Sequence, residues 1–154
     1  MFVGYTIQYC DEPPAPEPNG DTETAFAFGD ELALCFLDID EDNDGNGDFN
    51  RWGWTNGAIT AGLPGFWEWE IYAGAGQCDL SKGTLVGTLS VLYSTSGHFE
   101  ATYSMDTGFG LEETHLYVGI EILQQDGSGD FTVAPGQYDN IHEELWEIQK
   151  TPSS

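Results

Sequence analysis

Hydrophobic and polar residues alternate in short runs along most of this chain, a pattern typical of half-buried β-strands. In the segment 66–72, for example, Trp67, Trp69 and Ile71 lie on one face, and Phe66, Glu68, Glu70 and Tyr72 on the other. No segment of useful length has the 3.6-residue period of an amphipathic helix. The pattern predicts strands over residues 22–28, 31–37, 49–55, 66–72, 84–93, 98–104, 113–122, 129–133 and 142–148. Many short strands with Gly-, Asn- and Asp-rich turns predict an all-β fold, an antiparallel β-sandwich of Ig-like or jelly-roll-like type.

The first ten residues also alternate, but they are separated from the other predicted strands by a proline-rich segment. Val3, Tyr5, Ile7 and Tyr9 would share one face of a strand. Residues 11–20 contain four prolines within six consecutive positions, which favours a stiff, extended spacer of about 30 Å. We therefore expect an N-terminal strand over 1–10, a linker over 11–20, one β-sandwich domain over 21–150 and a short tail over 151–154.

A strand on a stiff tether has two possible places. It can fold back as an edge strand of its own sheet, or it can add to the sheet of a neighbouring copy. Head-to-tail exchange of the second kind does not close on itself and builds a filament. The sequence leaves both arrangements open.

The composition narrows the class of protein and its partners. The chain has 154 residues, enough for one domain with a real core, and 40% of them are hydrophobic. Its net charge is −24, from 27 acidic residues against Arg51, Lys82 and Lys150. This charge argues against nucleic acid or an anionic membrane surface as a partner and favours divalent cations. We expect no membrane-inserted segment, and residues 1–9 lack the pattern of a signal peptide, so a secreted protein would be a mature or truncated form.

The densest acidic segment is 38–48, and it resembles part of a calcium-binding loop. Asp40, Asp42, Asp44 and Gly45 form D-x-D-x-D-G, the first half of an EF-hand loop. The twelfth position is Arg51 rather than Glu, and no helical pattern flanks the segment, so we expect a calcium loop between two strands. The expected calcium ligands are Asp38, Asp40, Asp42, Asp44 and Asp48. The alternative is a solvated acidic hairpin, in which carboxylates ~5 Å apart would repel by roughly 3 kcal/mol.

The cysteines and a second acidic segment give two further expectations. Cys10, Cys35 and Cys78 lack any CxxC or Cys/His metal spacing, and Cys10 lies outside the predicted domain. We therefore favour a Cys35–Cys78 disulfide, with three reduced thiols or an intersubunit bond at the odd cysteine as alternatives. The segment 126–130 is expected to be a Gly-rich hairpin, with a weaker calcium site as the alternative.

No arrangement of residues in the sequence points to catalysis. His98, His115 and His142 lack zinc-ligand spacing, and we expect His115 to be a hydrogen-bonded structural residue. No nucleophile or P-loop motif is present, and a glycoside hydrolase, which needs two carboxylates at a defined separation, remains a remote alternative. Exposed tryptophans would favour sugar binding instead. The candidates are Trp52, Trp54, Trp67 and Trp69, all of which would equally suit a core.

From residue 21 onward, the chain resembles a family of secreted bacterial β-domains with YAGQ, GTLVG, ETHLYVG and PGQY motifs. The segments that carry the resemblance are 23–27, 51–57, 72–79, 80–87, 113–119 and 134–138. The resemblance covers roughly residues 21–138 and is specific as a set, but weak for each motif. It implies an extracellular structural or adhesive β-domain, and it supplies no activity and no catalytic residues. The N-terminal strand and its linker lie outside it.

The sequence therefore predicts an extracellular calcium-binding structural protein, a surface or filament subunit that self-associates by strand addition, by calcium bridging or by both. A carbohydrate-binding or adhesion module with a structural calcium is the alternative, with a glycan as its partner.

Overall fold

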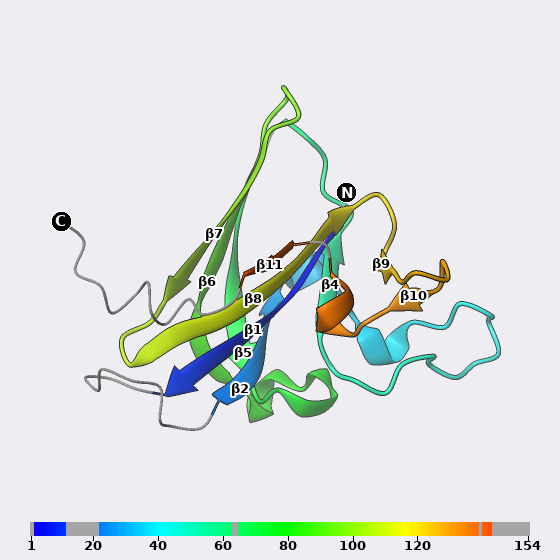
Figure 1. The fold of residues 1–154 in the computed structure, drawn as a ribbon, viewed down its shortest axis with the longest axis horizontal. Helices are drawn as coiled ribbons and strands as arrows, with labels where there is room; N and C mark the ends of the chain where they lie inside the picture. The colour runs from blue at the N-terminus through cyan, green and yellow to red at the C-terminus, as the bar shows by residue number, and fades with distance from the viewer. Residues whose placement is uncertain (1, 12–21, 63–64, 139, 143–154) are drawn as a thin grey trace.

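The computed structural model describes residues 2–11, 22–62, 65–138 and 140–142, and the regular structure in these residues consists of strands and short 3-10 helices (Figure 1). The strands are β1 (Phe2–Asp11), β2 (Thr22–Phe28), β3 (Ala33–Cys35), β4 (Trp54–Gly57), β5 (Phe66–Ala73), β6 (Thr84–Tyr93), β7 (Phe99–Met105), β8 (Phe109–Gly119), β9 (Gln124–Gln125), β10 (Phe131–Thr132) and β11 (Asn140–His142). Between them lie short 3-10 helices: η1 (Asp30–Leu32), η2 (Phe36–Asp38), η3 (Gly76–Cys78), η4 (Leu80–Lys82) and η5 (Pro135–Gln137).

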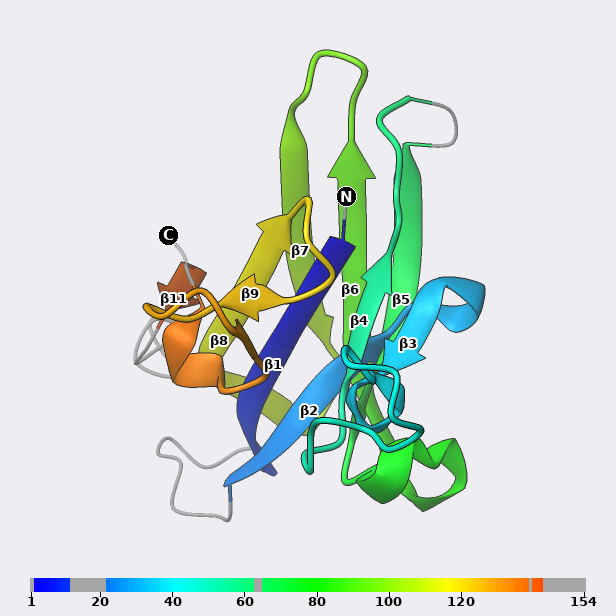
Figure 2. The ribbon, with the colours of Figure 1, turned by 90° about the vertical axis from the view of Figure 1, so that its right-hand side faces the viewer.

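Hydrogen bonds join nine of the described strands into one antiparallel sheet. Its order is β11-β8-β1-β2-β5-β6-β7, with β4 also paired to β1 and β3 paired to β4. The sheet curls into a half-barrel, as the two views at right angles show (Figures 1 and 2). Strands β9 and β10 form a separate small hairpin beside it. The predicted all-β, antiparallel class is confirmed, whereas the β-sandwich stays a prediction because the main strands belong to a single sheet.

Strand β1 lies in the interior of this sheet. It pairs with β8 along one side and with β2 and β4 along the other, so that Gln8 stands opposite both Thr24 and Glu113. The expectation of an edge strand folded back on its own sheet is therefore wrong in its position. Strands β2 and β8 each have one side free to pair with β1, and β1 fills the space between them. No pattern within residues 1–10 indicates this arrangement. Donation of this strand to a neighbour stays a prediction.

The predicted strand boundaries hold best where the alternation is longest. Strand β2 spans 22–28 as predicted, β6 spans 84–93, and β5 exceeds its predicted range by one residue. The predicted strand 31–37 is instead a three-residue strand between two 3-10 turns. The predicted strand 49–55 begins only at Trp54, because Gly53 has a φ of +146° and packs between the rings of Phe26 and Phe36. There, an added Cβ would lie 2.6 Å from Phe36 and 2.7 Å from Phe26.

In the C-terminal half of the chain, several observed strand boundaries differ from the predicted ones. Strand β8 begins at Phe109 and ends at Gly119, earlier at both ends than the predicted 113–122. Strand β7 agrees with its predicted range to within one residue at each end, and β10 retains two residues of the predicted 129–133. Of the predicted strand 142–148, only His142 is described, at the end of β11. The rest of that prediction lies outside the described residues.

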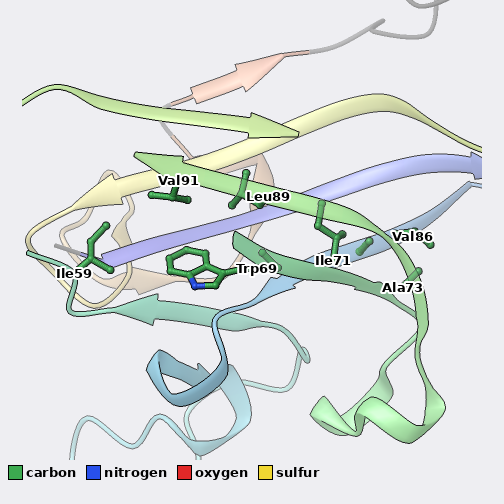
Figure 3. Packing of buried hydrophobic residues seen from close by; sticks show 9 residues of the cluster. Ile59, Trp69, Ile71, Ala73, Val86, Leu89 and Val91 are labelled. Carbon is green, nitrogen blue, oxygen red and sulfur yellow. The ribbon is translucent and has the colours of Figure 1, made fainter. Parts of the chain in front are cut away.

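Two hydrophobic clusters form the core. The first lies inside the curl of the sheet, where side chains of β5 and β6 such as Trp69, Ile71 and Leu89 are almost fully buried (Figure 3). Burial of each large side chain of this kind contributes about 1.5–3 kcal/mol. The second cluster gathers around Phe26, Phe36 and Trp54 at the base of the acidic segment. The second cluster anchors both ends of that segment, since η2 contains Phe36 and β4 begins at Trp54.

Candidate metal centre

The acidic segment 38–48 forms a closed loop on a fixed base. Strands β3 and β4 pair on either side of it, with Cys35 opposite Trp54. The N–H of Asp48 donates to the carbonyl oxygen of Ile39 at 2.8 Å, which closes the loop. Gly47 lies against the main chain at this closure, and a Cβ there would lie 2.0 Å from the carbonyl oxygen of Leu37. Only glycine fits this position, so the closure depends directly on the sequence.

Within the loop, main-chain N–H groups hold the carboxylates inward. The side chain of Asp40 accepts hydrogen bonds from the N–H groups of Gly45 at 2.8 Å and Asp44 at 3.1 Å. The Asp42 carboxylate accepts from the same Asp44 N–H at 3.1 Å. Asn43 and Gly45 have φ values of 58° and 90°, and these left-handed residues let the chain curl around Asp40. Asp40 and Asp42 therefore converge, as the D-x-D-x-D-G spacing predicts, but Asp44, the third Asp of that motif, does not join them.

Three carboxylates of the loop lie close together. Asp40, Asp42 and Asp48 each offer an oxygen, and these atoms all lie within 4.8 Å of one another. Asp40 is half-buried, while the other two are exposed. The predicted ligands Asp38 and Asp44 lie outside this group. Asp44 accepts the N–H of Asn46 at 2.7 Å, and Asp38 stands exposed at the end of η2. We refer to Asp40, Asp42 and Asp48 as the Asp triad.

The hydrogen bonds of the loop favour an ionised Asp40. Donation from the Gly45 N–H lowers the pKa of this carboxyl, burial opposes that effect, and the Asp44 N–H and the Asp42 side chain lower the pKa further. Asp40 is therefore a carboxylate at neutral pH, beside two more acidic side chains. An electrostatic arrangement of this kind attracts a cation.

The residues present fit calcium by donor type and by spacing. Calcium takes six to eight oxygen ligands at about 2.3–2.6 Å. Two ligands of the same ion can therefore lie up to about 5 Å apart, and the triad oxygens meet this limit. Three carboxylates provide part of the shell, and carbonyl groups of the loop and water are the donors that usually complete it.

A disulfide connects the base of this loop to the rest of the fold. Cys35, at the end of β3, is bonded to Cys78 in η3, with their Cα atoms 6.1 Å apart. The favoured pairing from the sequence is thus confirmed, and the alternative of three reduced thiols is wrong. Cys10 lies on β1, but the structure does not describe its side chain.

The second acidic segment is a hairpin, as expected. It connects β9 to β10, and the Asp126 carboxylate accepts hydrogen bonds from the N–H groups of Ser128 and Asp130. Its carboxylates do not converge as those of the triad do. Among the described residues, the triad is the one group of three or more Asp, Glu, His or Cys side chains close enough together to hold a metal ion.

The candidate tryptophans and histidines fall into different environments. Trp54 and Trp69 are buried in the two core clusters, at 3% and 2% exposure, so neither presents a free face to a ligand. Trp52 and Trp67 are half-buried and line two separate clefts. His115 is buried and hydrogen-bonded at both ring nitrogens, as expected of a structural histidine, whereas the exposed His98 contacts Glu100. The side chain of His142 lies outside the described residues.

Sequence reasoning missed the larger of these clefts. Its volume is about 540 Å³, and it lies beside the second core cluster. We call it the Arg51 cleft; its lining residues are Thr24, Phe26, Asn50, Arg51, Trp52, Glu113, His115, Val133, Pro135 and Gly136. The lining residues come from four segments that are distant in sequence. The only local signal for the cleft in the sequence is therefore the adjacent pair Arg51 and Trp52 in an otherwise acidic chain.

Comparison with known proteins adds no relative. No protein-family model matches the chain, and neither a curated protein nor a solved structure matches it. The resemblance described above therefore stays a prediction. In the described part of the chain, no helix has the length and apolar character needed to span a membrane.

Proposed function

We propose that this protein is an extracellular calcium-binding structural protein, a subunit of a surface or filament assembly. The observation that carries the proposal is the close approach of Asp40, Asp42 and Asp48 to one another. Such a group is most stable when a cation offsets the repulsion among its charges. The oxygen donors and their spacing suit calcium.

An extracellular location is supported by the Cys35–Cys78 disulfide. Disulfides persist in oxidising compartments and are rare in the cytosol of most organisms. Calcium loops of extracellular modules bind with dissociation constants of about 10⁻⁴–10⁻³ M, which suits an environment with millimolar calcium. The disulfide and the loop therefore favour the same compartment.

Assembly is supported by the position of β1. This strand makes main-chain hydrogen bonds to β8 on one side and to β2 and β4 on the other. The same bonds can form with the β1 strand of a second copy, and exchange of an identical element is a low-barrier route to association. Calcium would also reduce the repulsion between surfaces of a chain whose net charge is −24.

The alternative function, carbohydrate binding, has one observation in its favour. Trp52 is half-exposed in the Arg51 cleft rather than buried in the core. Aromatic rings beside polar side chains in a concave site are typical of small-ligand sites.

Light scattering with negative-stain microscopy tests the proposed function. The full chain is compared in millimolar calcium, in the same concentration of magnesium and in chelator. We expect filaments or higher-order assemblies with calcium, and reversal when chelator is added. A monomer under all three conditions would contradict the structural role, and assemblies that persist in chelator would contradict calcium control.

A further inference from the structure

The Arg51 cleft lies on one face of the sheet where β1 passes between β2 and β8. Thr24 on β2 and Glu113 on β8 both stand opposite Gln8 on β1, so their side chains share a face about 10 Å apart. Trp52 and Arg51, which follow the acidic loop, line the cleft together with Pro135 from η5. The volume of about 540 Å³ is within the usual range for a small-molecule site.

One wall of the cleft is apolar and held in place by aromatic packing. The ring of Trp52 contacts Phe26 edge-to-face, with centroids 4.8 Å apart, and it also packs on Trp54 at 5.7 Å. Trp52 nevertheless remains half-exposed, while the two rings that support it are buried. A fixed, partly exposed indole presents a flat surface to a ring with apolar C–H groups, such as a pyranose.

The opposite wall contains two side chains that contact each other, His115 and Glu113. Nδ1 of His115 lies 2.9 Å from the carbonyl oxygen of Pro135, so Nδ1 carries a hydrogen and donates it. Nε2 lies 2.8 Å from Oε1 of Glu113, and this second contact also requires a proton. This contact engages one oxygen of the Glu113 carboxyl group with His115 rather than with Arg51.

Arg51 has no ion-pair partner among the side chains that the structure describes. Among the described residues that line the cleft, the ionisable side chains are Arg51, Glu113 and His115. The ion pairs found among the described residues are His98–Glu100 and His115–Glu113, and neither includes Arg51. Its guanidinium lies near the buried Tyr138 hydroxyl, whose pKa is raised by burial and partly lowered again by Arg51.

We infer that the Arg51 cleft binds a saccharide that carries a single carboxylate, with the carboxylate on Arg51 and the sugar ring on Trp52. The planar guanidinium matches a carboxylate with two parallel hydrogen bonds. Glu113, Asn50 and Thr24 supply acceptors and donors for hydroxyl groups. A single carboxylate is favoured over a polyanionic chain because the net charge of −24 repels further negative charges outside the cleft.

Four of the six segments that carry the sequence resemblance meet at this cleft. Residues 23–27 contribute Thr24 and Phe26, 51–57 contribute Arg51 and Trp52, 113–119 contribute the His115–Glu113 pair, and 134–138 contribute Pro135 and Gly136. The calcium proposal uses none of these segments. The inference therefore depends neither on calcium binding nor on assembly.

The test is a titration of the full chain with matched saccharides, followed by ligand-observed NMR and calorimetry in calcium. The probes are disaccharides ending in glucuronate, galacturonate or sialate, each beside a neutral counterpart without the carboxylate. We expect at least one acid to bind and its neutral counterpart to bind at least about tenfold more weakly. Arg51 is exposed, and the Arg51→Gln variant should bind the acid at least about tenfold more weakly than the wild type. Lys82→Gln, which removes the other described cation, should leave the affinity unchanged.

Three outcomes would overturn the inference. The first is that no acid binds at about 10 mM, a concentration that detects affinities near the millimolar range. The second is that the acid and its neutral counterpart bind equally well. The third is that Arg51→Gln binds the acid with unchanged affinity. Trp52→Ala, checked for folding by circular dichroism, should weaken binding of the acid, whereas Trp67→Ala in the other cleft should not. Repeating the titration in chelator separates this site from the calcium loop, because the two proposals can then fail independently.

Discussion

At the scale of single residues, the acidic loop was the most predictable part of the candidate site. Alternating Asp residues followed by Gly specify a curl whatever the surrounding fold, because the carboxylates accept nearby N–H groups and Gly45 allows a positive φ. What the sequence could not give is which carboxylates converge. Asp48 joins Asp40 and Asp42 through the loop closure at Ile39, while Asp44 turns to Asn46.

Replacing two members of the Asp triad should remove calcium-dependent stability. With calcium at about 10–100 times its dissociation constant, binding stabilises the folded state by about 1.4–2.7 kcal/mol, or roughly 3–10 °C in Tm. We expect this rise in the wild type and its loss in Asp42→Asn/Asp48→Asn, measured by calorimetric melts with and without calcium.

Glu68→Gln, which neutralises an exposed carboxylate on β5, serves as the matched control and should keep the calcium-dependent rise. In chelator, the double variant should be about as stable as the wild type, because the amide oxygen of Asn can still accept the N–H groups that Asp42 and Asp48 accept, while the repulsion among the carboxylates falls. Equal losses with calcium and with chelator would mean that these residues stabilise the loop without a metal.

The buried Tyr138 hydroxyl should make the fold sensitive to alkali. Burial raises its pKa, an effect that the nearby Arg51 partly offsets. The unfolded chain therefore loses this proton near pH 10 while the folded chain keeps it, so stability is complete below about pH 10 and falls above it. Between pH 8 and pH 11, we expect the Tm of Tyr138→Phe to fall less than the Tm of the wild type. An equal fall in Tm would show that Tyr138 does not cause the alkaline destabilisation.

At the scale of elements, the sequence pattern predicted strand boundaries well where only one face of the strand is buried. Strands β2, β5 and β6 have long alternating runs, and their boundaries match the prediction closely. The pattern failed around β3 and β4, where close packing of Gly53 on two phenylalanine rings and 3-10 turns shorten the strands. These are tertiary contacts, and local periodicity carries no signal for them.

The Cys35–Cys78 disulfide holds together the elements at the base of the loop. Its cysteines are 43 positions apart, and closing a loop of this length in the unfolded chain is worth about 4 kcal/mol in the chain-entropy model. We expect Cys35→Ser/Cys78→Ser to lower the free energy of unfolding by about 2–4 kcal/mol in denaturant titrations. Cys10→Ser should leave this disulfide intact, and identical unfolding curves for all three proteins would contradict the predicted contribution.

At the scale of the whole molecule, the strand order was beyond the reach of the sequence. Composition and turn spacing fix an antiparallel all-β class, but β1 reaches the interior of the sheet only because β2 and β8 are brought to either side of it. The Arg51 cleft was missed for the same reason, since it depends on that strand order. In the sequence, Arg51 is one of three basic residues and a departure from the calcium motif, and neither feature indicates a cleft.

The exchange of β1 between copies can be recorded covalently. Gln8 and Thr24 are paired across β1 and β2, so Gln8→Cys/Thr24→Cys in a Cys10→Ser chain allows a disulfide at that pair. In a monomer, this bond should close within one chain. Oxidation of calcium-induced assemblies should instead give covalent ladders on non-reducing gels. If microscopy shows assemblies but the gels show no ladders, strand exchange is excluded and calcium bridging is left as the means of association.

Calorimetric titration of calcium into the full chain tests the central claim most directly. We predict saturable uptake with a dissociation constant of about 10⁻⁴–10⁻³ M, which disappears in Asp42→Asn/Asp48→Asn and is not reproduced by an equal concentration of magnesium. Binding heats that are identical in the wild type and the double variant would mean that calcium only screens the acidic surface. That result would contradict a calcium site at the Asp triad.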